Sequence, residues 1–228
     1  MKRLILFTVI VLFGITLFAQ ETFFPTKEGT VLIYQSFDKK GKATKGVRYT
    51  IEKVNIRGND LDIKYLCEAL GAKDDLVYKE EITIYQKENV ISFDMSGFLN
   101  KAAFQQNGQI PAEIKITGNS MQIPVNAEPG MTMPDANVAM SMKMGFINMK
   151  MSADVTNRKV EAVEDITVKA GTFKCYKFTS DVSVTAMGIN VKTKNTDWYA
   201  KGIGTVKTEA YDKNGKLQSV TELVDINN

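Results

Sequence analysis

The chain contains no histidine. Histidine is the commonest general base, the usual partner of a catalytic serine or cysteine, and the commonest protein ligand of zinc and iron. Its absence argues against hydrolase triads and zinc centres. It leaves open only functions that depend on shape, apolar surface or other side chains.

Other catalytic motifs are incomplete. Ser36-Phe37-Asp38-Lys39 matches the Ser-x-x-Lys string of penicillin-binding enzymes, but their Ser-Asp-Asn and Lys-Thr-Gly partners are absent and the string lies where a strand enters a turn. Gly202-Ile203-Gly204 lacks the third glycine and the helix of a dinucleotide loop. The carboxylate pairs Asp74-Asp75 and Glu80-Glu81 are adjacent, and adjacent strand residues point to opposite faces. We therefore expect no catalytic residues, no metal site and no cofactor, and predict that the protein is not an enzyme.

The first twenty residues have the layout of a secretory signal peptide. Lys2 and Arg3 precede the apolar run Leu4–Phe18, which ends at Ala19-Gln20-Glu21. The alternative is a membrane anchor, but the run is shorter than the ~20 residues that span a bilayer. We predict a signal peptide at 1–19, cleavage near Ala19-Gln20, and a periplasmic or secreted product that is not an integral membrane protein. Because no cysteine lies at the cleavage point, the sequence also predicts that the protein is not a lipoprotein.

The net charge of the exported chain is close to zero. Loss of residues 1–19 removes two of the 29 basic side chains and none of the 26 acidic ones, so the net charge falls to +1. Such a chain lacks the positive electrostatic potential that attracts nucleic acids and anionic membranes. We expect no nucleic-acid partner. Residues 20–228 suffice for a single exported domain with its own core.

Only two cysteines are present, Cys67 and Cys175. A disulfide between them would suit an oxidising envelope compartment. Two buried free thiols are an equally ordinary use of cysteine. Both residues lie at positions where an inward-facing strand residue is expected, and the sequence leaves the two alternatives open.

The rest of the chain alternates as strands do. Apolar and polar residues alternate with period two on either side of turns at 38–42, 57–60 and 212–216, a pattern typical of hairpins. Four of the five prolines fall within 111–134, which predicts a proline-rich crossing loop or an edge there. Residues 96–106 are expected to hold one short helix. The predicted class is all-β, an antiparallel sandwich or a strongly curved half-barrel sheet of ten to twelve strands.

Two hairpins are predicted in detail. A turn at Met144-Gly145 would pair Met142 with Ile147, and Met140 with Met149, all on one face. A second turn, centred on Gly188-Ile189, would pair Ala186 with Val191 and Val184 with Thr193. Each prediction rests on a change of parity in the apolar pattern at a glycine.

The methionines are unevenly distributed. Seven of the eleven fall between residues 131 and 151: Met131, Met133, Met140, Met142, Met144, Met149 and Met151. They can be core packing, a pliable apolar surface for a lipid or a partner, or a thioether site for cuprous copper. The candidate ligand-binding residues are those of the predicted methionine hairpin: Met140, Met142, Ile147, Met149 and Met151.

Three stretches carry a resemblance to a known family. Asn157-Arg158-Lys159-Val160-Glu161, the run Lys169–Lys177, and the run Trp198–Gly204 with the closing hairpin Tyr211–Gly215 resemble the exported TapB-like proteins of unknown function. The resemblance implies an all-β envelope protein and supplies no catalytic residue. A fainter likeness of layout is to periplasmic lipoprotein carriers whose curved sheet cups an acyl chain, which is an analogy of architecture alone.

Two classes of function follow. The first is a non-catalytic binding module, which would hold an apolar small molecule or an envelope protein against the methionine hairpin. The second is a structural or assembly protein with a filled core and no ligand. An apolar opening beside Met140 and Met149 would distinguish the first from the second.

Overall fold

The computed structural model describes residues 21–94, 114–144, 147–186 and 188–227. These residues form thirteen β-strands and no helix, so the all-β prediction is confirmed. The strands are β1 (Val31–Asp38), β2 (Ala43–Arg57), β3 (Asp60–Leu70), β4 (Leu76–Lys87), β5 (Val90–Asp94), β6 (Ile114–Gly118), β7 (Ser120–Pro124), β8 (Ala136–Met144), β9 (Ile147–Val168), β10 (Gly171–Ala186), β11 (Ile189–Ala200), β12 (Gly204–Asp212) and β13 (Leu217–Asn227). The predicted helix at 96–106 lies outside the described residues.

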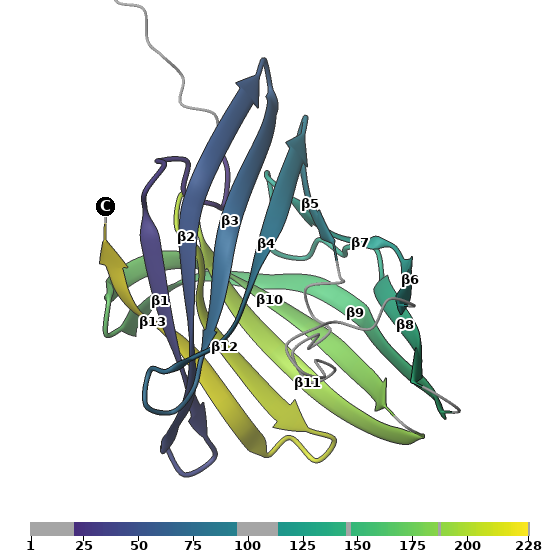
Figure 1. The fold of residues 1–228 in the computed structure, drawn as a ribbon. Helices are drawn as coiled ribbons and strands as arrows, with labels where there is room; N and C mark the ends of the chain where they lie inside the picture. Colours follow the sequence, from purple (N-terminus) through teal and green to yellow (C-terminus); the bar gives the residue numbers. More distant parts are fainter. Residues whose placement is uncertain (1–20, 95–113, 145–146, 187, 228) are drawn as a thin grey trace, which may run out of the picture.

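All thirteen strands belong to one antiparallel sheet. Its order is β6-β8-β9-β10-β11-β12-β13-β1-β2-β3-β4-β5-β7. The sheet curls until β7, at one end of that order, lies beside β8, next to the other end (Figure 1). The prediction of ten to twelve strands was too low. The sandwich alternative was wrong, because one nearly closed, barrel-like sheet replaces two stacked ones.

Two of the turns predicted from the sequence, at 38–42 and 212–216, connect strands in the structure. In the turn from β1 to β2, the carboxylate of Asp38 accepts hydrogen bonds from the backbone N–H groups of Lys40 and Lys42. At the turn from β12 to β13, the carboxylate of Asp212 likewise accepts hydrogen bonds from the backbone N–H groups of Asn214 and Lys216. These backbone donors favour the ionised form, so they lower the pKa of both carboxyls.

The proline-rich segment contains two strands that the sequence analysis missed. β6 and β7 lie within the predicted crossing loop at 111–134, which is therefore corrected. Pro124 is the last residue of β7, and Pro129 and Pro134 lie beyond it, so no proline falls inside either strand. Gly118 ends β6 at a φ of 149°, where an added Cβ would lie 2.2 Å from the carbonyl oxygen of Asn137.

Both predicted hairpins exist, but each register was wrong by two residues. Met142 pairs with Met149 rather than with Ile147. Val184 pairs with Val191 rather than with Thr193. A shift of two residues restores the same faces, because side chains alternate with period two. The faces of both hairpins were therefore predicted correctly although their turns were misplaced.

Arg158 fixes the seam where the sheet nearly closes. Its guanidinium is buried and donates to the carbonyl oxygen of Pro134 at 2.7 Å and to that of Gln122, on β7, at 2.8 Å. Asn157, at a φ of 52°, lies with Arg158 where the β9–β10 register is irregular. This bulge directs the Arg158 side chain to the seam.

The segment after the predicted cleavage site lies in the core. Phe23 is fully buried, and its ring packs edge-on against those of Tyr176, Phe178 and Tyr199 at centroid distances of 5.2, 6.0 and 6.0 Å. The carbonyl oxygen of Thr22 accepts the backbone N–H of Gly202 at 2.9 Å. Among the described residues, the chain is therefore packed into the domain from Thr22 onward.

The position of Phe23 sharpens the processing prediction. We expect the exported protein to begin at Gln20 or Glu21, because cleavage beyond Phe23 would remove a buried ring from the core. N-terminal sequencing of protein recovered from the envelope measures the start directly. A mature chain that began at Met1, or after Phe23, would contradict this prediction.

Candidate functional site

Cross-strand pairing aligns apolar side chains of neighbouring strands into rows on one face of the sheet. Residues paired directly across a ladder point to the same face. Followed from β6 through β8, β9 and β10 to β11, one row consists of Gly118, Val138, Ala153, Val184 and Val191. The next row consists of Ile116, Met140, Met151, Ala186 and Ile189. With Met142 and Met149 of a third row, these residues are called the apolar face below.

The apolar face is covered at its centre and open at the β11 side. Val138 and Met140 on β8 are only 2% and 3% exposed. Exposure rises through the half-buried Val184 and Ala186 of β10. On β11 it reaches 55% for Val191 and 69% for Ile189, at the tip of the β10–β11 hairpin (Figure 1). One continuous apolar surface therefore runs from the core to solvent.

The structure places four of the five predicted site residues together. Met140 and Met142 are buried in one cluster, and the half-buried Met149 and Met151 pack against it. The side chain of Ile147 lies outside the described residues. Two further methionines, Met121 and Met133, are buried as well, the first in this cluster and the second in the neighbouring aromatic one.

A row of polar side chains on the same face was missed by the sequence analysis. Along β11 the residues that share the face of Ile189 and Val191 are Thr193, Asn195 and Asp197. Pairing then continues from Asp197 through Thr208 and Thr221 to Ser36, and we call these four residues the polar belt. The alternation along β11 was visible in the sequence, but the partners on β12, β13 and β1 follow only from the sheet order.

Hydrogen bonds link the polar belt in pairs. The hydroxyl of Thr208 donates to Oδ1 of Asp197 at 2.6 Å. The hydroxyls of Ser36 and Thr221 lie 2.8 Å apart. Burial raises the pKa of Asp197 to about 6, against the lowering effects of the Thr208 bond and the Arg158 charge. This carboxyl lies on the same face of β11 as Val191, but it pairs across the ladder with Phe178 of the aromatic cluster.

Asp197 should make stability depend on pH. Between its ordinary pKa of 3.8 and the folded value of about 6, the folded state keeps a proton that the unfolded state has released. Stability from this group is thus present at pH 4 and is lost as the pH rises through 6. We expect Asp197→Asn, which keeps an acceptor for Thr208, to raise the unfolding free energy by about 1 to 2 kcal/mol at pH 8.

Urea unfolding of the parent and of Asp197→Asn at pH 4, 6 and 8 measures this effect. The difference should narrow toward pH 4, where the carboxyl of the folded parent is protonated and carries no charge. A difference that stayed constant over this range would show that the charge of Asp197 carries no cost in the folded protein.

Aromatic side chains fill the other end of the interior. Tyr34, Tyr49 and Tyr65 pack edge-on in series, with centroids 5.7 and 6.2 Å apart. The hydroxyl of Tyr34 donates to the carbonyl oxygen of Thr205, whereas the buried hydroxyl of Tyr65 has no partner among the described residues. Burial raises the pKa of all three phenols. This end is a packed core rather than an opening.

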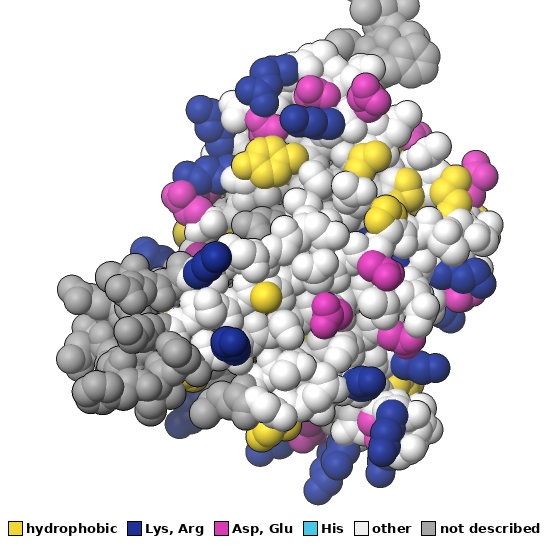
Figure 2. Space-filling model, turned by 90° about the vertical axis from the view of Figure 1, so that its right-hand side faces the viewer, with side chains coloured by type: hydrophobic (Ala, Val, Ile, Leu, Met, Phe, Trp, Pro, Cys, Tyr) yellow, Lys and Arg dark blue, Asp and Glu magenta, His cyan; other side chains and the backbone are white. Residues whose placement is uncertain are grey.

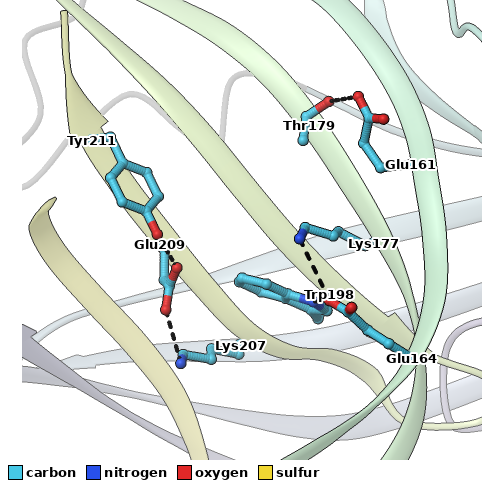
Figure 3. A network of polar contacts seen from close by, with 8 residues as sticks. All are labelled: Glu161, Glu164, Lys177, Thr179, Trp198, Lys207, Glu209 and Tyr211. Atoms are coloured by element: carbon cyan, nitrogen blue, oxygen red, sulfur yellow. Dashed lines mark hydrogen bonds and ion pairs between the residues drawn. The ribbon is translucent and has the colours of Figure 1, made fainter. Parts of the chain in front are cut away.

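The residues of the sequence motifs converge on a polar network that spans β9 to β12 (Figure 3). Trp198 donates from Nε1 to Oε1 of Glu164 at 2.7 Å, and the ammonium groups of Lys177 and Lys207 lie 5.5 and 5.6 Å from its ring. Lys207 also pairs with Glu209 at 2.8 Å. These charged groups pair with one another, and Trp198 is buried beneath them. We therefore interpret the network as structural.

The two cysteines are free thiols in the structure. Cys175 is fully buried and Cys67 is half-buried. Burial raises the pKa of the Cys67 thiol, and raises that of Cys175 to about 11. Both are therefore protonated at neutral pH and poorly nucleophilic.

The outer surface carries no concentration of one charge on the side in view. Figure 2 shows basic and acidic side chains interspersed over that face, with hydrophobic side chains gathered toward its upper half. Among the described residues, no helix is long and apolar enough to cross a membrane.

Comparison with known families gives a match over most of the chain. The model of the DUF3108-like family matches residues 27–223. No curated protein matches the chain. These findings carry nothing specific to the TapB-like proteins, so that finer resemblance stays a prediction.

Two solved structures share the fold. A "putative exported protein with YmcC-like fold" from Bacteroides fragilis is 19% identical, with a TM-score of 0.75, and covers 91% of this chain and 100% of its own. A "putative lipoprotein" from Parabacteroides distasonis is 23% identical, with a TM-score of 0.76, and covers 92% of this chain and 100% of its own. At these identities the likeness establishes the fold alone.

The second of these relatives corrects one prediction. The sequence analysis inferred from the missing cysteine near Ala19 that the protein is not a lipoprotein, in a periplasmic or secreted location. That prediction was wrong, because the same fold occurs in a protein described as a putative lipoprotein. Absence of a cysteine at one position does not set this chain apart from such relatives.

Proposed function

We propose a function from the premise that the chain belongs to the DUF3108-like family. The protein is an exported, non-catalytic envelope protein, and it holds an apolar chain against the apolar face. One observation carries the proposal: the rows of that face run without a polar interruption from buried Val138 to Val191, which is 55% exposed. Single exposed apolar residues are ordinary. An exposed edge continuous with a buried face is typical of a surface that a ligand covers.

The side chains of the apolar face suit an acyl chain. Methionine is unbranched and polarisable, so Met149 and Met151 can adjust to an irregular apolar guest. Covering Val191 and Ile189 would remove apolar surface from water, at about 25 cal/mol for each Å². A lipid chain is therefore the guest that we favour over a folded envelope protein.

The alternative is a structural protein with a filled core. It is supported by the aromatic end, where Phe23, Tyr34 and Tyr65 are buried and the rings pack edge-on. That observation concerns the end remote from the β10–β11 tip. It accounts for the fold of the aromatic end and leaves the exposure of Ile189 unexplained.

Lipid extraction of the protein purified from the envelope, followed by mass spectrometry, tests the proposal. We expect a co-purifying acyl lipid, and a several-fold loss of that lipid in Val191→Asp. Val77→Asp is the matched control, since Val77 is 58% exposed on β4, away from the apolar face. Protein that carried no lipid would favour the structural alternative, and cuprous copper retained in its place would favour the thioether reading of the methionines.

Methionine truncations separate packing from ligand contact. We expect Met140→Ala to cost about 2 to 3 kcal/mol in unfolding free energy, because Met140 is buried and its removal leaves a cavity that pliable neighbours fill only in part. Met149→Ala should cost less than ~1.5 kcal/mol, because Met149 is half-buried. Urea unfolding measures both costs, and the lipid content of each variant is measured alongside. A large cost for Met149→Ala without loss of lipid would place Met149 in the dry core.

A further inference from the structure

We infer that one end of the barrel docks on the surface of an anionic lipid bilayer, with exposed lysines on the lipid headgroups and Ile189, at the β10–β11 tip, inserted among them. The inference rests on the proposed function and adds to it that the acyl chain comes from a bilayer. Docking itself is measured on protein that carries no lipid, so the two can fail separately.

The sheet order brings three turns together at this end. The β10–β11, β12–β13 and β1–β2 turns follow one another in the order β10-β11-β12-β13-β1-β2. Because every pairing in this series is antiparallel, all three turns lie at the same end of the barrel (Figure 1). We call residues 38–42, 189–192 and 212–216 the tip surface.

Lysine dominates the tip surface. Its six lysines are all exposed: Lys39, Lys40, Lys42, Lys192, Lys213 and Lys216. Its two acidic residues, Asp38 and Asp212, direct their carboxylates to backbone N–H groups of their own turns. In the described part of the chain none of the six lysines forms an ion pair, whereas Lys64, Lys159 and Lys207 on the strands each pair with a glutamate. Six lysines against two aspartates give the tip surface a net charge of +4.

The near-zero net charge of the whole exported chain argued against an anionic membrane as a partner, but that charge is an average over the molecule. A bilayer attracts the charges that lie within about one Debye length of its surface, ~10 Å at 0.1 M salt. At the opposite end of the barrel the turn at 57–60 carries one basic and one acidic residue, and its Arg57 pairs with Asp62. Positive charge is therefore grouped at the tip surface and is balanced at this opposite turn.

Exposed apolar side chains lie among the lysines of the tip surface. Ile189 and Val191, which form the outer end of the apolar face, are 69% and 55% exposed. Binding to a bilayer surface gains both from buried apolar area and from attraction to anionic lipids. An anionic bilayer offers negative charge and an apolar interior together, which a soluble anion does not. With Ile189 inserted, the apolar face would meet the hydrocarbon of the bilayer, and an acyl chain would pass between them without crossing water.

Sedimentation with lipid vesicles tests the inference. Delipidated exported protein is mixed with vesicles of phosphatidylcholine alone, or of phosphatidylcholine with about one-third phosphatidylglycerol, and the bound fraction is measured after centrifugation. At about 0.05 M sodium chloride we expect at least fivefold more bound protein on the anionic vesicles. At about 0.5 M this excess should disappear, because salt screens the exposed lysines.

Two triple variants that lose the same charge separate the tip surface from the rest of the molecule. The tip variant combines Lys39→Gln, Lys40→Gln and Lys213→Gln. The control variant combines three exposed lysines from the opposite end, Lys53→Gln, Lys87→Gln and Lys169→Gln. We expect the tip variant to bind anionic vesicles at least fivefold less than the parent does, and the control variant to bind as the parent does.

A second pair of variants tests the apolar insertion. Ile189→Asp should reduce binding to anionic vesicles at least threefold. Ile56→Asp is the matched control, because Ile56 is 62% exposed at the opposite end, and it should leave binding unchanged.

Equal binding of the parent to neutral and anionic vesicles, or an equal loss in the tip and control variants, would overturn the inference. Failure of the parent to sediment with any vesicle would also overturn it, and would point to a protein as the partner of the tip surface. The proposed function is decided separately, by the lipid extracted from the purified protein.

Discussion

Replacing Phe23 by alanine is expected to lower the unfolding free energy by about 3 to 5 kcal/mol, the range for large aromatic side chains removed from a packed core. Phe23 is fully buried, and three other rings surround it edge-on. The ammonium group of Lys201 lies 4.4 Å from the centroid of its ring and would lose that contact as well. Urea unfolding of the exported variant measures the loss.

Phe24→Ala provides the comparison for Phe23. Phe24 is the adjacent residue and is half-buried, with centroids 6.4 Å from those of Tyr65 and Tyr199. It should cost roughly half as much, because its ring is only partly removed from water. Equal and small costs for the two variants would show that the segment from Glu21 to Phe24 is not docked in solution, and would weaken the link between leader cleavage and folding.

The sequence predicted faces better than it predicted registers. Period two assigned Met140, Met142, Met149 and Met151 to one face, and the structure confirms that assignment. The turn was misplaced because a turn at Met144-Gly145 and a turn one residue later give the same alternation of apolar and polar side chains. Only the observed pairing of Met144 with Ile147 distinguishes the two turn positions. Period fixes which side a residue faces, whereas register depends on the turn that closes the hairpin.

The sheet order was beyond reach of the sequence. β7 pairs with β5 and β6 pairs with β8, so the segment 114–124 supplies both edges of the sheet. The prolines suggested a loop because proline interrupts strands. Their positions mark where strands end, but they do not show which strands pair with one another. The polar belt was missed for the same reason, since Asp197 and Ser36 belong to one row only through β12 and β13.

Arg158 is the residue whose role depends most on this long-range order, and its removal should be as costly as that of Phe23. In Arg158→Ala the carbonyl oxygens of Pro134 and Gln122 lose charged donors at 2.7 and 2.8 Å within a buried seam. Each such bond contributes about 1.5 to 3 kcal/mol, so we expect a loss of about 3 to 5 kcal/mol in unfolding free energy. Arg158→Lys should recover only part, because an ammonium group lacks the fork that reaches two acceptors at once.

The distribution of the loss distinguishes a seam from general packing. If Arg158 holds β7 against β8, hydrogen exchange in Arg158→Ala should quicken first at the amides of β7 and of the segment that precedes β8, while β2 and β3 keep their protection. Arg48→Ala is the matched control: Arg48 lies on β2, is 40% exposed and pairs with Glu68 at 3.4 Å, so its loss should cost less than ~1 kcal/mol. A cost for Arg158→Ala as small as that of Arg48→Ala, with protection of β7 unchanged, would mean that the sheet keeps its curvature through side-chain packing alone.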